Sequence, residues 1–440
     1  MPRVRLNCRF FRWRRGFLTR EDLVSSSYQR TSLAGSAVIC VTLLSTPALA
    51  ETVRVAFIDP LSGTFAALGQ NELQSFHAMA ARANQEKWAG DNQLEFVGFD
   101  NQASPQISLV QLKNAIDQGY RYITQANGSG AALALIDAIN KHNERNPGKE
   151  VMFLNHGAVD PSLTNDKCSF WHFGFDANAD MKSQVLINHL ATNPAIKKVY
   201  IINQDYAAGH QFTRGEKEYL KSARADLELV GEDLVPLGKV KDFSPYIAKI
   251  KASGADSVVT GNWGTDLSLL IKAAKEAGLN ANFYTYYANL KGAPIAMGAD
   301  GADRVRYVGI WNINNETFAG EDIATSFKQK YNDDFTWMVS YSIVAMFSKA
   351  IKESGSTDPV KVGFALEGMK ATSLNGQVEM RASDHQLLQP LYIGVWTKAD
   401  GKTVKYDQEG TGYGWKTEKK YEASASTQPT TCAMKRPPRS

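Results

Sequence analysis

Short apolar runs alternate with amphipathic helical segments along most of this chain, and that alternation constrains the fold more than any other feature. The expected strands are 53–58, 94–99, 121–124 and 151–153 in a first series, and 198–202, 227–235, 257–260 and 283–286 in a second. The expected helices between and beside them are 68–88, 107–118, 131–141, 181–191, 210–223, 246–252 and 267–277. Strands that alternate with helices form parallel sheets from right-handed βαβ units. Two such series predict an α/β fold with two doubly wound, parallel-sheet lobes.

The pattern changes after residue 308. Helices are expected at 321–330, 339–352 and 360–369, followed by strands at 376–380 and 391–396. Late helices followed by late strands suit a chain that returns to the first lobe and then crosses back. The sequence therefore predicts lobe I from 51–175 and 309–373, and lobe II from 176–308 and 374–410. The remaining 411–440 is a polar C-terminal tail rich in Lys, Ser, Thr and Pro, expected to be mobile apart from Cys432.

Residues 1–50 have the features of an export signal. The apolar run 33–44 is too short to span a bilayer easily, and Ala48 and Ala50 supply the small residues that signal peptidase accepts. We expect a secretory signal peptide behind an upstream start codon, cleaved after Ala50, and an exported protein. Export through the twin-arginine route, from the pair Arg14 and Arg15, and a membrane anchor through 33–50 remain alternatives.

The charge of the chain is unevenly distributed. The first 50 residues hold eight of the 49 basic residues and two of the 45 acidic ones, so the rest has a net charge of −2. A body without a basic excess does not indicate nucleic-acid binding.

Two cysteines remain after the signal is removed, Cys168 and Cys432, because Cys8 and Cys40 leave with it. Two cysteines in an exported protein favour one disulfide, which here ties the C-terminal tail to the body. Two free thiols are the alternative.

Polar and aromatic residues follow the ends of the expected strands, where open α/β sheets bind their ligands. These strand-end segments are 59–63, 127–130, 155–161, 203–209, 261–264 and 286–289. They combine glycines, hydroxyls, amides and aromatic rings, a mixture that suits a small, partly apolar ligand with a polar head.

The segment Asn127-Gly128-Ser129-Gly130 joins an expected strand to an expected helix. Such a turn can hold a nucleophile, a phosphate or a carboxylate. The Gly-x-Ser-x-Gly and phosphate-loop motifs are absent, although His156 offers a base for Ser129. The seven histidines show no metal-binding spacing, so neither metal nor cofactor is expected. A hydroxyl and free N–H groups at a helix N-terminus favour a carboxylate, with a serine N-cap and no ligand as the alternative.

The chain resembles the periplasmic substrate-binding proteins of ABC importers of the branched-chain amino acid type, which include the leucine/isoleucine/valine-binding protein. The resemblance covers nearly all of 51–410, through the order and spacing of its motifs and the export signal. The segments that carry it are 53–63, Gly69, 127–129, 155–158, 203–209, 261–263, 376–386 and 390–392. It implies two lobes joined by three crossovers that close on the ligand by a hinge.

The same resemblance implies how a ligand would be held. The carboxylate would bind Ser129, beside Gly128, and the backbone amides from Gly157 through Ala158 to Val159. The family's two ammonium contacts fall on Val159 and Tyr287.

Aromatic side chains are expected to form the wall of the site, with Trp263 at a family wall position. A second wall position falls on Ala208, which leaves Tyr206 as the nearest ring.

Two of these positions depart from the family pattern, because neither Val159 nor Tyr287 carries a negative charge. An ammonium buried without an acceptor costs several kcal/mol. Either an aspartate substitutes, or the ligand has no ammonium; the candidate aspartates are Asp59, Asp160 and Asp205. The predicted ligand is therefore a small carboxylate, either an aliphatic amino acid or an aromatic or keto acid.

The function that the resemblance implies is non-enzymatic delivery of this ligand to a membrane ABC permease, by a protein expected to be a monomer. A ligand sensor that docks to a receptor and a hydrolase that uses Ser129 are the alternatives.

Overall fold

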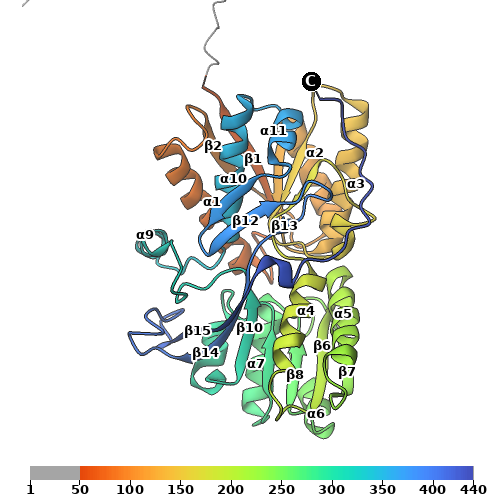
Figure 1. Ribbon diagram of the computed structural model, residues 1–440, viewed down its shortest axis with the longest axis vertical. Coiled ribbons are helices and arrows are strands. Elements are labelled where there is room, and N and C mark those ends of the chain that lie inside the picture. Colours follow the sequence, from red (N-terminus) through yellow and green to blue (C-terminus); the bar gives the residue numbers. More distant parts are fainter. Residues whose placement is uncertain (1–49, 440) are drawn as a thin grey trace, which may run out of the picture. The chain divides into compact units, whose positions relative to one another are not determined.

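Two parallel β-sheets organise the protein, as Figure 1 shows for the computed structural model, which describes residues 50–439. The first sheet has the order β2-β1-β3-β4-β5 and is parallel throughout. Its strands are β1 (Thr52–Asp59), β2 (Gln93–Asp100), β3 (Tyr122–Gln125), β4 (Met152–Asn155) and β5 (His172–Gly174). The predicted strands of the first series are all present in it, and this sheet with its helices is the first lobe.

The second sheet repeats the same winding, with the order β15-β14-β10-β9-β8-β6-β7. Its strands are β6 (Lys198–Asp205), β7 (Glu228–Pro236), β8 (Ser257–Thr260), β9 (Asn282–Thr285), β10 (Val305–Gly309), β14 (Leu391–Lys398) and β15 (Tyr413–Tyr421). The strands from β7 to β10 are parallel, and β14 and β15 are antiparallel additions. The predicted α/β fold with two doubly wound lobes is confirmed.

Helices connect and flank these strands (Figure 1). They are α1 (Ala66–Gln85), α2 (Pro105–Asp117), α3 (Ser129–Arg145), α4 (Ala179–Leu190), α5 (Ala207–Ala223), α6 (Ser244–Ala252), α7 (Gly264–Glu276), α8 (Ala293–Met297), α9 (Glu321–Tyr331), α10 (Val339–Ser354) and α11 (Pro359–Leu366). Short 3-10 helices occur at Pro161–Thr164, Gly298–Gly301 and Ala423–Ala425.

The chain returns to the first lobe after β10. Helix α10 packs against α1, and its Phe347 ring lies 4.6 Å from the ring of Tyr122 on β3. The apolar face of α10 thus completes the core of a lobe that begins almost 300 residues earlier in the sequence.

A third, antiparallel sheet follows α11 and consists of β11 (Lys370–Ser373), β12 (Gly376–Met380) and β13 (Leu387–Leu388). Gly174 at the end of β5 forms a parallel bridge with Gln386, so this small sheet adjoins the first lobe. Of the stretch 374–410, which the sequence places in lobe II, β14 is the strand that joins the second sheet. The exact lobe boundaries stay a prediction.

The expectation of a mobile tail after Thr411 is wrong for β15. This strand pairs antiparallel with β14 and buries Gly414 and Trp415. The remaining side chains are mostly lysine, glutamate and threonine on an outer strand, where charged residues discourage pairing with other chains. Such a composition is easily mistaken for disorder.

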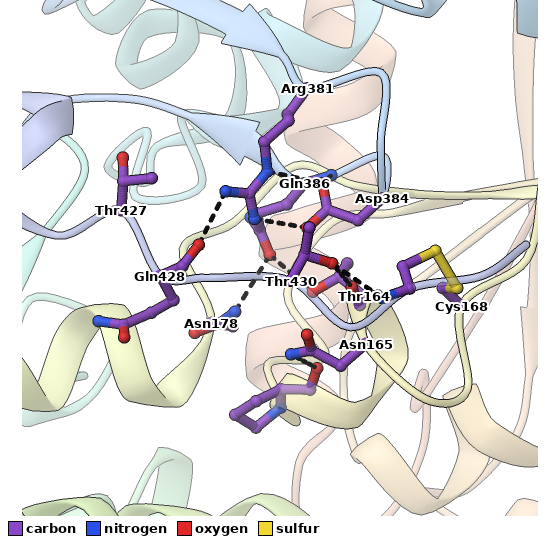
Figure 2. Close-up of polar contacts among 12 residues, drawn as sticks. Thr164, Asn165, Cys168, Asn178, Arg381, Asp384, Gln386, Thr427, Gln428 and Thr430 are labelled. Atoms are coloured by element: carbon purple, nitrogen blue, oxygen red, sulfur yellow. Dashed lines mark hydrogen bonds and ion pairs between the residues drawn. A yellow bond between two sulfur atoms is a disulfide. The ribbon is translucent and has the colours of Figure 1, made fainter.

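Beyond β15 the tail runs to the first lobe, where several contacts hold it (Figure 2). Arg381 binds Asp384 through two hydrogen bonds and donates a third, of 2.8 Å, to the backbone oxygen of Gln428. The predicted disulfide between Cys168 and Cys432 is present and joins positions 264 residues apart.

The predicted signal peptide, 1–50, lies outside the described residues except for Ala50. Among residues 50–439 no helix combines the length and the apolar character needed to cross a membrane.

Candidate functional site

The strand order creates a switch point in each lobe, because the chain leaves β1 and β6 in one direction and returns on their other side. Ligands of doubly wound folds bind at the carboxyl ends of strands at such points. A cavity lies there. It is lined by Leu68, Ala126, Asn127, Gly128, Ser129, Gly157, Tyr206, Trp263, Tyr287, Leu290 and Trp337. Six of the eight predicted ligand-binding residues are in this set, whereas Ala158 and Val159 are not.

Ser129 is the first residue of α3, and Gly128 is its N-cap. Gly128 has a φ of +103°, a conformation that favours glycine and turns the chain from β3 into the helix. The Ser129 side chain is buried, and its Oγ accepts a hydrogen bond of 3.3 Å from the backbone N–H of Asp160. The hydroxyl hydrogen therefore remains available to a ligand, next to the N–H groups of Ser129 and Gly130 at the start of the helix; those of Ala131 and Ala132 donate to the carbonyl of Gly128.

The backbone amides predicted to complete a carboxylate clamp are already partly engaged. The N–H groups of Gly157 and Ala158 donate to Oδ1 of Asn155 at 3.0 and 2.8 Å. Val159 packs in the hydrophobic core, and its carbonyl accepts from the N–H of Ala179 at 2.8 Å. The part of these three residues in ligand binding stays a prediction.

Gly157 lies against the cavity because the packing there has no room for a side chain. A Cβ atom at this position would lie 2.8 Å from Cζ2 of Trp337 and 3.0 Å from Cβ of Ala126. Glycine thus lets the indole of Trp337 approach the backbone and close one side of the cavity.

The second lobe supplies an aromatic wall from Tyr206, Trp263 and Tyr287, at the ends of β6, β8 and β9. The indole N–H of Trp263 donates to the hydroxyl of Tyr206 at 3.2 Å, and the Trp263 ring packs against Phe65 of the first lobe at 4.2 Å between centroids. Burial raises the pKa of Tyr206 and of Tyr287 above the ordinary tyrosine range. Both rings are therefore neutral phenols at physiological pH.

Trp337 is the main cavity residue that strand-end patterns do not reveal. It precedes α10, in the part of the chain that returns to the first lobe, and its indole Nε1 donates to Nδ1 of His156 at 2.7 Å. The contact joins residues 181 positions apart. Leu68 on α1 and Leu290 after β9 are likewise cavity residues without a motif of their own.

A buried polar network holds the loop that carries Ser129. Asp59 accepts from the backbone N–H groups of Ala126 and Asn127 at 2.9 and 2.8 Å, and its Oδ2 lies 3.0 Å from Nε2 of His156. The side chain of Asn127 donates to Glu72 at 2.6 Å. Burial and the neighbouring charge of Asp59 raise the pKa of Glu72, against the lowering effect of the Asn127 hydrogen bond.

Asp59, Glu72 and His156 are close enough together to be considered as a metal site. However, an indole N–H can only donate, so the bond from Trp337 makes Nδ1 of His156 an acceptor. Nε2 must then carry the proton that it donates to Asp59. Both ring nitrogens are engaged, so the cluster is better described as a hydrogen-bond network that positions the loop.

The same network concerns the hypothesis that His156 acts as a base for Ser129 in a hydrolase. Within residues 50–439, no hydrogen bond joins His156 to Ser129. The base proposed for a hydrolase is directed at Asp59 and Trp337 instead.

The three aspartates considered as ammonium acceptors are occupied elsewhere. Asp59 is bound as described, Asp160 caps a short helix by accepting from Ser162 N–H at 2.9 Å, and Asp205 forms an exposed ion pair with His210. None of the three lines the cavity.

Comparison with known proteins identifies the family. Residues 52–402 match the family described as periplasmic binding protein. The chain belongs to this family. Its members bind small-molecule ligands and work with ABC transporters.

Among relatives, the Leu/Ile/Val-binding protein homolog 4 of Brucella melitensis is 30% identical over 404 residues, which cover 89% of this chain and 94% of that protein. The crystal structure of the leucine-, isoleucine-, valine-, threonine- and alanine-binding protein from Brucella ovis, in a closed conformation, is 29% identical with a TM-score of 0.78, covering 88% of this chain and all of that one. A solute-binding protein from R. palustris in complex with 4-hydroxybenzoate is 21% identical with a TM-score of 0.72, covering 84% and 97%. The resemblance to branched-chain amino acid binding proteins is confirmed.

Proposed function

We propose that this protein is the periplasmic binding component of an ABC importer for a small organic carboxylate that has an apolar body and no ammonium group. Ser129 and the N-terminus of α3 bind the carboxylate, and the rings of Tyr206, Trp263, Tyr287 and Trp337 enclose the rest. The protein delivers the ligand to a membrane permease.

The observation that carries this proposal is the lack of an acidic residue among the residues that line the cavity with Ser129. Asp176 lines the adjoining cavity, where it is already paired with Lys182. The resemblance places Tyr287 at a position that contacts the ammonium in amino acid binders of the family, and the raised pKa of Tyr287 keeps it uncharged. A free amino acid would leave its ammonium with neutral acceptors only, such as backbone carbonyls or the amide of Asn127. A cation in a closed cavity without a carboxylate partner loses several kcal/mol relative to water.

The carboxylate end of the ligand is favoured by charge as well as by hydrogen bonds. The helix dipole places a partial positive charge at the first turn of α3, where Ser129 lies. Four aromatic rings and two leucines line the remainder. This combination of one anion-binding end and an apolar wall supports a carboxylate with a ring or a branched chain. The bound 4-hydroxybenzoate of the R. palustris protein is a ligand of that kind.

A branched-chain amino acid is the second candidate, favoured by the relatives. The Brucella proteins named above carry leucine, isoleucine and valine in their names, and one of them is 30% identical. The aliphatic part of leucine would meet the same apolar wall as an organic acid. The two candidates differ in the ammonium alone.

A thermal-shift panel tests the proposal on protein first unfolded and refolded to remove any ligand carried through purification. Aliphatic amino acids, keto acids and benzoate-like acids are compared with uncharged amides of the same size. Stabilisation by acids and not by amides is expected. Stabilisation by uncharged or cationic compounds alone would refute the carboxylate assignment. A permease encoded by an adjacent gene, whose ATP hydrolysis responds to the ligand-loaded protein, would support the transport role.

A further inference from the structure

A second cavity lies next to the first and shares three lining residues with it, Tyr287, Leu290 and Trp337. Two charged side chains, Asp176 and Lys182, are among its other lining residues. The aromatic wall of the first cavity therefore also borders a second cavity whose lining includes a pair of ions.

Asp176 and Lys182 form a buried ion pair. Nζ of Lys182 donates to Oδ2 of Asp176 at 2.6 Å, and the two side chains are only 4% and 8% exposed. The ammonium also lies 5.0 Å from the centre of the Tyr287 ring, which lines both cavities. Lys182 thus lines the second cavity beside a ring that borders both cavities.

The location of this pair is unfavourable for stability alone. Lys182 is in the first turn of α4, where the helix dipole disfavours a positive charge. Burying both ions costs hydration that their attraction only partly restores, and apolar residues of similar volume usually serve a core at least as well. A buried ion pair that adds little stability, placed at the wall of a cavity, indicates a role in binding a ligand.

The hydrogen bonds of the pair leave capacity for a ligand. An ammonium has three donors, and within residues 50–439 Nζ of Lys182 has one hydrogen bond, to Asp176. Oδ1 of Asp176 accepts from the N–H of Ala177 at 2.8 Å, and a carboxylate has further lone pairs. The pair thus offers a donor and an acceptor side by side, with no net charge.

We propose that Lys182 and Asp176 bind a hydroxyl group on the end of the ligand opposite its carboxylate. A hydroxyl can accept from the ammonium of Lys182 and donate to the carboxylate of Asp176 at the same time, whereas a carbonyl on the ligand could only accept and an ammonium on the ligand could only donate. A second carboxylate on the ligand would be attracted by Lys182 but repelled by Asp176. The inference rests on the proposed function, and it narrows the ligand to a hydroxy-substituted organic acid such as a hydroxybenzoate.

Calorimetric titration of the wild-type protein with benzoate, 4-hydroxybenzoate and terephthalate tests this assignment. These three probes share a ring and a carboxylate and differ in the group at the far end. The hydroxy acid is expected to bind roughly 10- to 100-fold more tightly than benzoate, as for a hydrogen bond to a charged partner. Tighter binding of terephthalate than of the hydroxy acid would overturn the hydroxyl assignment.

Variants then connect the preference to the pair. The double substitution D176N/K182Q removes both charges together, so that neither ion is left buried alone. Its preference for 4-hydroxybenzoate over benzoate is expected to fall, because neutral amides form weaker hydrogen bonds to a hydroxyl than the two ions do. K217Q/E232Q, which removes the exposed pair between Lys217 and Glu232, is the matched control and should retain the preference.

The outcomes separate this inference from the proposed function. If the wild type binds both acids and D176N/K182Q keeps its preference, the inference is overturned and the proposed function stands. If the wild type binds leucine but none of the three acids, both are overturned. Thermal unfolding of each variant establishes that a loss of preference is not a loss of fold.

Discussion

Replacing Ser129 by alanine removes one hydroxyl from the anion-binding end of the cavity and leaves α3 in place. Ser129 is 1% exposed, and Gly128, not Ser129, is the N-cap of the helix. The hydroxyl has two functions in our account. It accepts from the N–H of Asp160 at 3.3 Å, and it donates to the ligand carboxylate.

Removing the hydroxyl should therefore lower two quantities separately, the ligand affinity and the free energy of unfolding. A hydrogen bond to a charged group contributes about 1.5–3 kcal/mol, so S129A should bind the carboxylate roughly 10- to 150-fold more weakly. The N–H of Asp160 loses its partner as well. Because its bond is long, we expect this to lower the free energy of unfolding by about 1 kcal/mol, the low end for an unsatisfied buried donor.

Isothermal titration measures the first loss and urea unfolding the second, with Ser104→Ala as the matched control. Ser104 is the N-cap of α2, and its Oγ also accepts a 3.3 Å hydrogen bond from a backbone N–H, that of Ile107. S104A should lose about 1 kcal/mol of stability, as expected for an N-cap, and keep its ligand affinity. Unchanged affinity in a folded S129A protein would remove Ser129 from the binding site and refute the reasoning.

Three further predictions concern the cavity wall, a buried acid and the disulfide. Gly157→Ala places a methyl group 2.8 Å from Trp337 and should abolish tight binding, whereas Gly130→Ala, whose Cβ would have its nearest neighbour at 3.8 Å, should not; equal affinities in titration would contradict this. Burial raises the pKa of Glu216 to about 7, against opposing hydrogen bonds, so the folded state holds its proton more tightly than the unfolded chain and stability falls as pH rises. Between pH 5 and 7 the free energy of unfolding of the wild type, measured in urea, should fall by about 2 kcal/mol more than that of E216Q. An equal pH dependence of the two free energies would contradict the raised pKa of Glu216. Cys432→Ser should lower the free energy of unfolding by about 2–4 kcal/mol, and a reductant should have the same effect on the wild type but none on the variant.

Much of the fold follows from sequence patterns because the apolar runs are short, buried and regularly spaced between helices. β3 illustrates this, since all four of its residues are buried and Tyr122, Ile123 and Thr124 are of the types that strands favour. β15 shows the opposite case. Its three lysines and its one glutamate, Glu418, are exposed at the edge of a sheet, so periodicity is weak and the composition resembles that of a disordered tail.

The residues of the site likewise include some that sequence patterns predict and some that they do not. Residues directly after strands, such as Ser129, Tyr206 and Trp263, could be predicted because parallel strands bring their carboxyl ends to one edge. Trp337 could not, since it reaches the cavity from a loop that only tertiary packing brings back to the first lobe. Lys182 could not either, because a lysine on an amphipathic helix is normally exposed and only the fold places it opposite Asp176.

The central claim is that the cavity accepts a carboxylate and does not accommodate an ammonium. Calorimetric titration with pairs of compounds that share one carbon skeleton measures this directly: L-leucine against 4-methylpentanoate, and L-phenylalanine against 3-phenylpropanoate. Each pair differs only in the ammonium, so the affinity ratio reports the free energy of placing that cation in the cavity. Our account predicts that the acid without the ammonium binds more tightly in the pair whose skeleton fits. Tighter binding of the amino acid would contradict it and would assign the protein to amino acid uptake.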